Sequence, residues 1–250
     1  MKENEYRIMY EIERTYWWFK GKQFLIDLFL KMYLGDSRDN RLLDIGSGTG
    51  IILKLLEKYG FGFGVELSEV GIKFLKKRNL NLIVRSDANQ PMPFRNDIFS
   101  AITCLDVLEH LENDFGLLKE MVRICKPGGF IVITVPAMPF LWSTHDEALN
   151  HKRRYTRKHL LNQIVSLDCT VSKASYFNSS LFLPIILVRK IRSFFSEGKK
   201  AESDFFMALP EWLNRSLYLW YLTELNCLRF ANIPFGISIL LILEKQGSNR

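Results

Sequence analysis

Short apolar segments alternate with segments of helical spacing along the middle of the chain. The apolar segments span residues 41–45, 62–66, 82–85, 98–104 and 130–135, and the helical spacing covers 50–59, 68–78 and 113–125. Short apolar runs are typical of strands buried on both faces, and helices between such strands connect parallel neighbours. The pattern predicts an α/β fold with a doubly wound, mostly parallel sheet.

The segments on either side of this alternation follow other patterns. Residues 5–34 have apolar positions at helical spacing, and residues 156–166 predict a further helix. Strands are expected over 169–177 and 236–244, which brings the sheet to seven strands. We expect three regions: an N-terminal helical cap over 1–40, a core of 41–177 and 233–246, and an aromatic-rich helical insertion over 178–232.

Two proline-containing segments predict breaks in the regular pattern. Pro127-Gly128-Gly129 is expected to end the helix before residue 130 and to turn the chain. Pro136 and Pro139 predict the start of a loop that runs through a basic cluster.

Composition excludes several classes of protein. With 48% apolar and 24% charged residues, the 250-residue chain has a globular rather than a disordered composition. Four widely spaced cysteines without a CxxC pair argue against a zinc site or a disulfide framework, so we expect the reducing cytoplasm. We read no export signal in the charged first residues, and the apolar runs at 181–188 and 233–243 fall short of the roughly 20 residues that span a bilayer.

The net charge of +7 is unevenly distributed. One basic cluster lies at 73–78, and another at 152–158 is flanked by His151 and His159. Solvated helix faces, an anionic substrate and an anionic membrane surface are three explanations that the sequence leaves open.

A glycine-rich segment, Asp44-Ile45-Gly46-Ser47-Gly48-Thr49-Gly50, lies between a predicted strand and a predicted helix. Glycines there let the backbone turn tightly and let a ligand approach closely, at the carboxyl end of a strand where open α/β sheets bind small molecules. The spacing is GxGxG, whereas dinucleotide sites use GxGxxG. This spacing disfavours a NAD-linked dehydrogenase.

Further motifs follow in order behind this loop: Glu66 at a strand end, Asp87-Ala88, Pro91-Met92-Pro93-Phe94, Cys104 to His110, and Lys126-Pro127-Gly128-Gly129. Residues 41–135 thus resemble the class I methyltransferases that depend on S-adenosyl-L-methionine (SAM), with the glycine loop similar to their motif I. The resemblance implies a Rossmann-like fold, with SAM as the cofactor and S-adenosyl-L-homocysteine as its product. The cofactor-binding residues that it implies are Asp44, Gly46, Ser47, Gly48, Gly50, Glu66, Leu67, Asp87, Ala88, Cys104 and Leu105.

Three histidines are candidate catalytic residues, because transfer to a hydroxyl group needs a base. His110 follows the fourth predicted strand, while His145 and His151 lie in the loop after the fifth. Asp146 could orient one of the latter two. A metal site formed by His145, Asp146 and His151 is an alternative, but we expect no metal because no fourth ligand is suggested. The loop could also be chiefly a structural lid.

Aromatic and basic residues are candidates for binding the methyl acceptor. The Trp17-Trp18-Phe19 element and the loop around His151 together resemble a bacterial and archaeal subfamily of these enzymes. From this we expect acceptor contacts from Trp17, Trp18, Arg153, Arg154 and Tyr155. The alternatives are that the tryptophans are core packing and that Arg153 and Arg154 pair with carboxylates of the fold.

The sequence therefore predicts a SAM-dependent methyltransferase that acts on a small-molecule or lipid- or sugar-linked acceptor at oxygen. A non-catalytic SAM-binding or scaffold protein is the main alternative. A nucleic-acid methyltransferase is disfavoured, because Cys104-Leu105-Asp106-Val107 stands where base-amino methylases usually carry Asn-Pro-Pro-Tyr. We expect a monomer or homodimer in the cytoplasm. The insertion could form an oligomer contact, a substrate cap or a lipid-binding surface. Its basic and aromatic residues suit peripheral membrane contact: Arg189, Lys190, Arg192, Phe194 and Phe195.

Overall fold

A seven-stranded sheet forms the centre of the computed structural model, which describes residues 3–35, 38–182, 186 and 209–247. The strand order is β3-β2-β1-β4-β5-β7-β6. Neighbours from β3 to β5 are parallel, and β7 runs antiparallel to both β5 and β6. The strands are β1 (Asn40–Ile45), β2 (Gly60–Val65), β3 (Ile83–Val84), β4 (Phe99–Leu105), β5 (Cys125–Pro136), β6 (Cys169–Phe177) and β7 (Ser238–Lys245). The predicted seven-stranded, mostly parallel sheet is confirmed.

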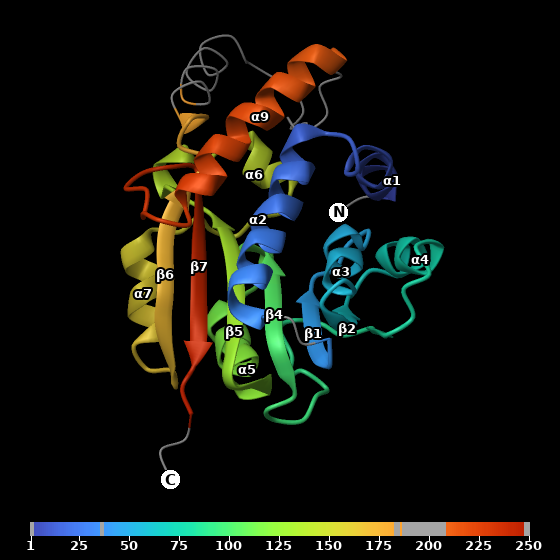
Figure 1. Ribbon diagram of the computed structural model, residues 1–250, viewed down its shortest axis with the longest axis vertical. Coiled ribbons are helices and arrows are strands. Elements are labelled where there is room, and N and C mark those ends of the chain that lie inside the picture. Colours follow the sequence, from blue (N-terminus) through green and yellow to red (C-terminus); the bar gives the residue numbers. More distant parts are fainter. Residues whose placement is uncertain (1–2, 36–37, 183–185, 187–208, 248–250) are drawn as a thin grey trace.

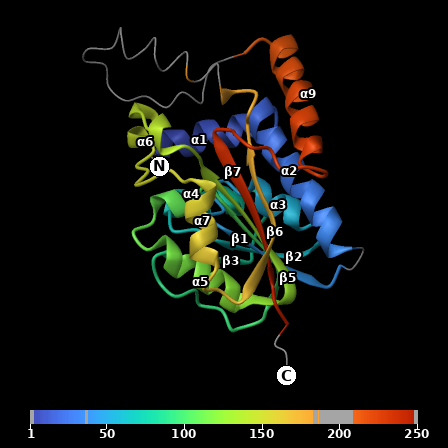
Figure 2. The same cartoon turned by 90° about the vertical axis from the view of Figure 1, so that its left-hand side faces the viewer.

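Helices cover both faces of this sheet (Figures 1 and 2). On one face lie α5 (Asp114–Ile124) and α7 (Arg157–Ile164), and on the other lie α2 (Trp17–Leu34), α3 (Ile51–Leu56) and α9 (Glu211–Cys227). Successive strand residues point to opposite faces, so Leu43 joins the first core and Leu42 the second. This is the doubly wound arrangement that the sequence predicts.

Four parallel strands end at the same edge of the sheet. Ile45 pairs with Val65 on β2 and with Cys104 on β4, while Leu105 pairs with Thr134 on β5. The order of strands reverses between β1 and β4, and open α/β sheets form their ligand crevice at such a reversal. The segments that follow these strand ends are therefore brought together.

Shorter elements surround that edge. They are α1 (Glu3–Ile12), α4 (Glu69–Lys77), α6 (Thr144–Ala148) and two 3₁₀ turns, η1 (Leu108–His110) and η2 (Pro139–Leu141). The five-residue helix α6 lies where the sequence predicts only a loop. Its first turn is held by Asp146, whose carboxylate accepts the Ser143 backbone N–H at 3.0 Å.

Pro127-Gly128-Gly129 does not turn the chain before the fifth strand, as the sequence predicts. The helix ends at Ile124 and β5 begins directly at Cys125. The three residues form an irregularity inside the strand, since Phe99 pairs with Cys125 but Ala101 pairs with Phe130. Between these two pairs β5 has more residues than β4. Gly128 has a φ of 72°, and this left-handed backbone lets β5 accommodate the additional residues.

The N-terminal helix α2 packs against α9 of the insertion. Trp17 and Trp18 both lie against Tyr221, the first edge-on at 5.5 Å and the second stacked at 5.9 Å between ring centroids. A Cβ built on Gly21 would lie 2.1 Å from a ring carbon of Tyr221. This close approach of two helices explains a glycine in the middle of α2.

Of the insertion, the described part is mainly α9; the basic and aromatic residues for which we expect membrane contact lie outside the described residues. Trp212 and Trp220 of α9 are exposed, whereas Tyr221 is buried. Among the described helices, none is long and apolar enough to cross a membrane.

Replacing Gly21 with alanine tests the contact between α2 and α9. Alanine favours helix by about 1 kcal/mol, but its methyl group would displace the confined Tyr221 ring, and such overpacking costs about 1–3 kcal/mol. We expect a net loss in the free energy of unfolding, measured by urea denaturation. Lys31→Ala, on the exposed side of the same helix, is the control and should change it little. A Gly21→Ala protein more stable than the wild type would contradict this packing.

Candidate cofactor and acceptor site

The glycine loop after β1 has a backbone that other residues rarely adopt. Gly46, Gly48 and Gly50 have φ values of 74°, 53° and 91°, in the left-handed region where glycine carries no steric cost. A Cβ on Gly46 would lie 2.5 Å from a methyl carbon of Val107. The loop therefore contacts the segment that follows β4, and a side chain at position 46 would collide with Val107 of that segment.

Glu66, at the end of β2, lies beside the same loop. Its carboxylate accepts the Gly48 N–H at 2.7 Å and the Ser68 N–H at 2.8 Å, and the residue is 7% exposed. The structure thus brings together the glycine loop and the acidic strand end, which the sequence predicts as two parts of one cofactor site.

Helix α1 lies over this loop, a feature that sequence analysis missed. Glu13 is buried, accepts the Thr49 hydroxyl at 2.5 Å and pairs with Arg78. Tyr6 donates its hydroxyl to Glu66 at 3.4 Å, and burial, followed by the charge of Glu66, raises the pKa of Tyr6 to about 12. No local signal marks these contacts, because their partners are 36 to 65 positions apart in the chain.

Asp44 is a buried carboxyl group at the end of β1. It accepts the Thr103 hydroxyl at 2.7 Å, and Ser47 donates to its main-chain oxygen at 2.9 Å. Burial raises the pKa of Asp44 to about 7, despite these hydrogen bonds. Its contacts tie the glycine loop to β4.

The remaining predicted cofactor residues differ in their placement. Asp87 forms a turn in which its carboxylate accepts the backbone N–H and the side-chain amide of Asn89, at 2.9 and 3.0 Å. Leu67 is 54% exposed, and Ala88 and Leu105 are half-buried. The Cys104 side chain lies in the core, so a contact from this residue would come from its main chain.

Asp106 follows β4 in a left-handed conformation with a φ of 54°. It pairs with Lys22 of α2 and accepts the Thr134 hydroxyl at 3.0 Å. Burial opposes ionisation of Asp106, but Lys22 and these hydrogen bonds hold its pKa below the usual range. Sequence analysis did not single out Lys22, although it lies one helical turn after Trp18 and 5.9 Å from that ring.

His151 is held by a buried carboxylate. Its Nδ1 lies 3.0 Å from Asp146, whose carboxylate also accepts from the Arg154 guanidinium at 2.7 Å. Burial opposes the charge of Asp146, but His151 and Arg154 lower its pKa well below the usual range. Of the two histidines that Asp146 could orient, His151 is the one whose ring nitrogen lies at hydrogen-bonding distance from its carboxylate in this structure.

Two further residues, Glu109 and His110 of η1, lie against His151. Its Nε2 is 3.9 Å from Glu109 Oε1, and the His110 and His151 rings meet edge to face at 4.9 Å. Glu109 is completely buried, and burial raises its pKa well above the usual value. Burial also lowers the pKa of His110 to about 4, and the nearby His151 adds to this. The ligand-capable atoms of these three residues all lie within 4.8 Å of one another.

The other predicted acceptor residues serve mainly internal contacts in this structure. Tyr155 is buried and donates to Asp114 at 2.8 Å, and Arg153 pairs with Asp114 at 3.1 Å. Arg154 also donates to the Ala137 carbonyl at 3.0 Å. These contacts favour the alternative in which the basic residues pair with carboxylates of the fold. His145 lies in α6 and is not part of the cluster formed by Glu109, His110 and His151.

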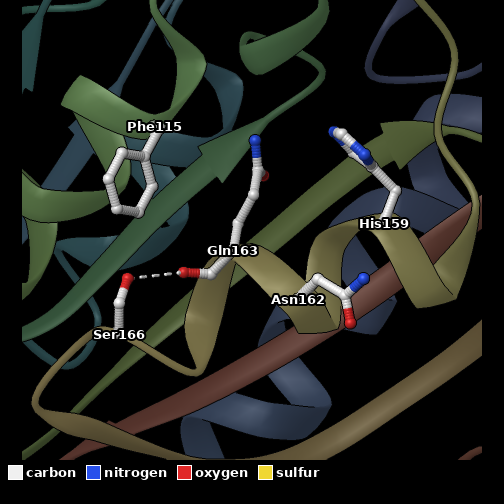
Figure 3. A pocket seen from close by; sticks show the side chains of 5 residues that line it. All are labelled: Phe115, His159, Asn162, Gln163 and Ser166. Atoms are coloured by element: carbon white, nitrogen blue, oxygen red, sulfur yellow. Dashed lines mark hydrogen bonds between the residues drawn. The ribbon is translucent and has the colours of Figure 1, made fainter.

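A hollow on the outside of α5 and α7 contains none of the predicted cofactor residues (Figure 3). It is lined by Phe115, His159, Asn162, Gln163 and Ser166. Ser166 donates to the Gln163 carbonyl at 3.4 Å, and the Gln163 side-chain amide donates to Asp114 of α5 at 3.4 Å, so these polar groups serve internal contacts.

Comparison with known proteins points to methyltransferases. Residues 43–133 match the family model described as a methyltransferase domain, from within β1 to within β5. An uncharacterized methyltransferase of Mycobacterium tuberculosis is 28% identical over 146 residues, covering 53% of this chain and 56% of the relative. The chain thus spans about half the length of this curated relative.

Solved structures share the fold over most of the chain. A putative methyltransferase from Bacillus halodurans has a TM-score of 0.58 at 16% identity, over 88% of this chain and 99% of that one. A SAM-dependent methyltransferase from Archaeoglobus fulgidus has a TM-score of 0.55 at 22% identity, over 89% and 94%. Residues 43–133 thus match a methyltransferase domain, and most of the chain shares the fold of these solved methyltransferases.

Proposed function

We propose that this protein transfers the methyl group of SAM to an oxygen atom of a small-molecule or lipid- or sugar-linked acceptor. The observation that carries the proposal is His151, an imidazole oriented by the buried Asp146 beside the segment that follows β4. That segment also contacts the glycine loop, through Val107 and Gly46. A group able to activate a hydroxyl thus lies next to the cradle for the methyl donor.

The cofactor end of the site suits SAM by its backbone and by its chemistry. Gly46 and Gly48 carry no side chain at the turn after β1, so a ligand can approach the main chain closely there. Glu66 has two acceptor oxygens beside this loop, and ribose hydroxyls are donors that such a carboxylate binds. The 3.4 Å hydrogen bond from Tyr6 is weak, so a ribose hydroxyl can take its place.

The group around His151 supports oxygen as the methylated atom. SAM supplies an electrophilic methyl group on a positively charged sulfur. The acceptor oxygen attacks the methyl carbon in line as the carbon–sulfur bond breaks, and the electron pair of that bond stays on sulfur. A neutral hydroxyl is a weak nucleophile, so it must lose its proton, and we place this loss at the group around His151.

The region between α2 and α9 is the proposed place for the rest of the acceptor. Trp18 lies here, stacked on Tyr221 and near Lys22. The edge of an aromatic cluster suits an apolar or ring-containing part of a substrate. In this proposal Arg153 also contacts the acceptor, since its side chain is partly exposed.

Glu66→Gln tests the cofactor site. It keeps the shape of the side chain but removes the charge that strengthens hydrogen bonds from ribose. Hydrogen bonds to charged groups contribute about 1.5–3 kcal/mol, so affinity for S-adenosylhomocysteine should fall by about 10- to 150-fold in calorimetric titration. Glu69→Gln, on the exposed start of α4, should bind like the wild type. Absence of binding by the wild type at millimolar ligand would refute the proposed cofactor role.

His151→Asn tests the acceptor end. With tritium-labelled SAM and a cell extract as the source of acceptors, transfer should fall by about 10²- to 10⁴-fold, the usual contribution of a group that handles a proton. Affinity for S-adenosylhomocysteine should stay within about twofold. His159→Asn, in the hollow of Figure 3, is the control and should transfer normally.

Two results would contradict this proposal. Transfer by the His151→Asn protein at the wild-type rate would remove His151 from the reaction. Cofactor binding by the wild type without labelling of any extract component would favour the non-catalytic SAM-binding alternative.

A further inference from the structure

Three potential metal ligands converge at the carboxyl end of β4. Glu109 and His110 belong to η1, and His151 comes from the loop after α6. Each has a ligand-capable atom within 4.8 Å of those of the other two. Two imidazoles and one carboxylate form a ligand set that borderline divalent cations such as Zn²⁺, Mn²⁺ and Fe²⁺ accept.

The Glu109 carboxylate has no hydrogen-bond partner within the described part of the chain. Both of its carboxylate oxygens are buried without one, and the residue has no exposed surface. A buried carboxyl group without partners is costly, and native proteins seldom keep one without a reason. Its nearest charge-capable neighbour is His151 Nε2 at 3.9 Å, which is too far for a hydrogen bond but leaves room for an ion between the two atoms.

Both imidazoles are oriented as metal-binding histidines usually are. His151 has its Nδ1 on Asp146 at 3.0 Å, and His110 has its Nδ1 3.4 Å from the Asn150 carbonyl. An acceptor at one ring nitrogen fixes the tautomer and leaves the lone pair of the other nitrogen for a cation. The nitrogen left on His151 is the one that faces Glu109.

The charges around the three residues favour a cation. Asp106, Glu109 and Asp146 are the carboxylates here, and Asp106 and Asp146 are already paired with Lys22 and Arg154. Ionised Glu109 would therefore add a negative charge that no cationic side chain pairs with among the described residues. A divalent cation would compensate that charge and use the unpartnered oxygens at the same time.

We propose that Glu109, His110 and His151 bind a divalent transition-metal cation and leave coordination positions open for an oxygen of the acceptor. This replaces the expectation from the sequence that the chain binds no metal. The sequence suggests His145, Asp146 and His151 as possible ligands, but Asp146 is engaged by His151 and Arg154.

The role of the cation in catalysis rests on the function proposed above. A hydroxyl bound to a divalent cation loses its proton to water near neutral pH, because the cation stabilises the oxyanion. The oxyanion then forms the new carbon–oxygen bond as the carbon–sulfur bond breaks. His151 thus acts on the acceptor as a ligand of the cation, held in place by Asp146. Acceptors with two neighbouring oxygens, such as vicinal diols or catechols, suit two open positions.

Titration of the metal-free full-length protein with Co²⁺, followed by its visible absorption, tests the site. We expect one Co²⁺ per chain, displaced by Zn²⁺. Glu109→Gln and His110→Asn should each weaken Co²⁺ binding by about 10- to 100-fold or more. Two matched controls should bind like the wild type. Glu112→Gln changes an exposed carboxylate three residues after Glu109, and His159→Asn changes a histidine outside the proposed site. Thermal unfolding of each variant shows whether it is folded.

The outcomes separate the metal site from the methyl-transfer function. No stoichiometric Co²⁺ uptake by the wild type, or equal uptake by a folded Glu109→Gln protein, would overturn the metal site. Titration of the same samples with S-adenosylhomocysteine tests the cofactor role independently. Normal cofactor binding together with absent Co²⁺ binding would overturn the metal site alone.

Discussion

The strand order reversal between β1 and β4 is the constraint on which the site depends. Because β1 pairs with β2 on one side and β4 on the other, Ile45 lies level with Val65 and Cys104. The residues that follow all three strands must then meet at one edge. The glycine loop, Glu66 and the segment from Asp106 to His110 are brought together by backbone pairing.

The loop after β5 is the second part of the arrangement, and backbone contacts return it to the same edge. The Lys152 N–H donates to the Glu109 carbonyl at 2.8 Å, and the Tyr155 N–H donates to the Pro136 carbonyl at 2.9 Å. The buried Tyr155 hydroxyl then fixes this loop to α5 through Asp114. The residues that we expected from the sequence to contact the acceptor thus hold the loop so that His151 faces Glu109.

The central sheet could be predicted because its signal is local. The expected strand over 169–177 coincides with β6, and the strand before the glycine loop differs from β1 by one residue. Errors arose where a local signal had two meanings. Pro127-Gly128-Gly129 is typical of a turn but also suits a strand irregularity, and the Ser143-to-Asp146 spacing that begins α6 resembles a capping box inside an apparent loop.

The candidate site was only partly predictable, because its contacts are long-range. The cofactor residues follow strands in a regular order, so they could be singled out from the sequence. Glu109 and His151 are 42 positions apart and meet only through the path of the loop after β5, and Lys22 reaches Asp106 from a helix more than 80 positions earlier. The periodicity of apolar residues does not reveal contacts between residues so far apart in the chain.

A crystal structure of the full chain with S-adenosylhomocysteine bound would show whether Glu66 and His151 lie in one site. We expect ribose hydroxyls at hydrogen-bonding distance, about 2.6–3.2 Å, from the Glu66 carboxylate. We also expect the sulfur atom to face the segment from Asp106 to His110, on the side where His151 lies. Ribose away from Glu66, or a sulfur separated from His151 by the body of the protein, would contradict a shared site.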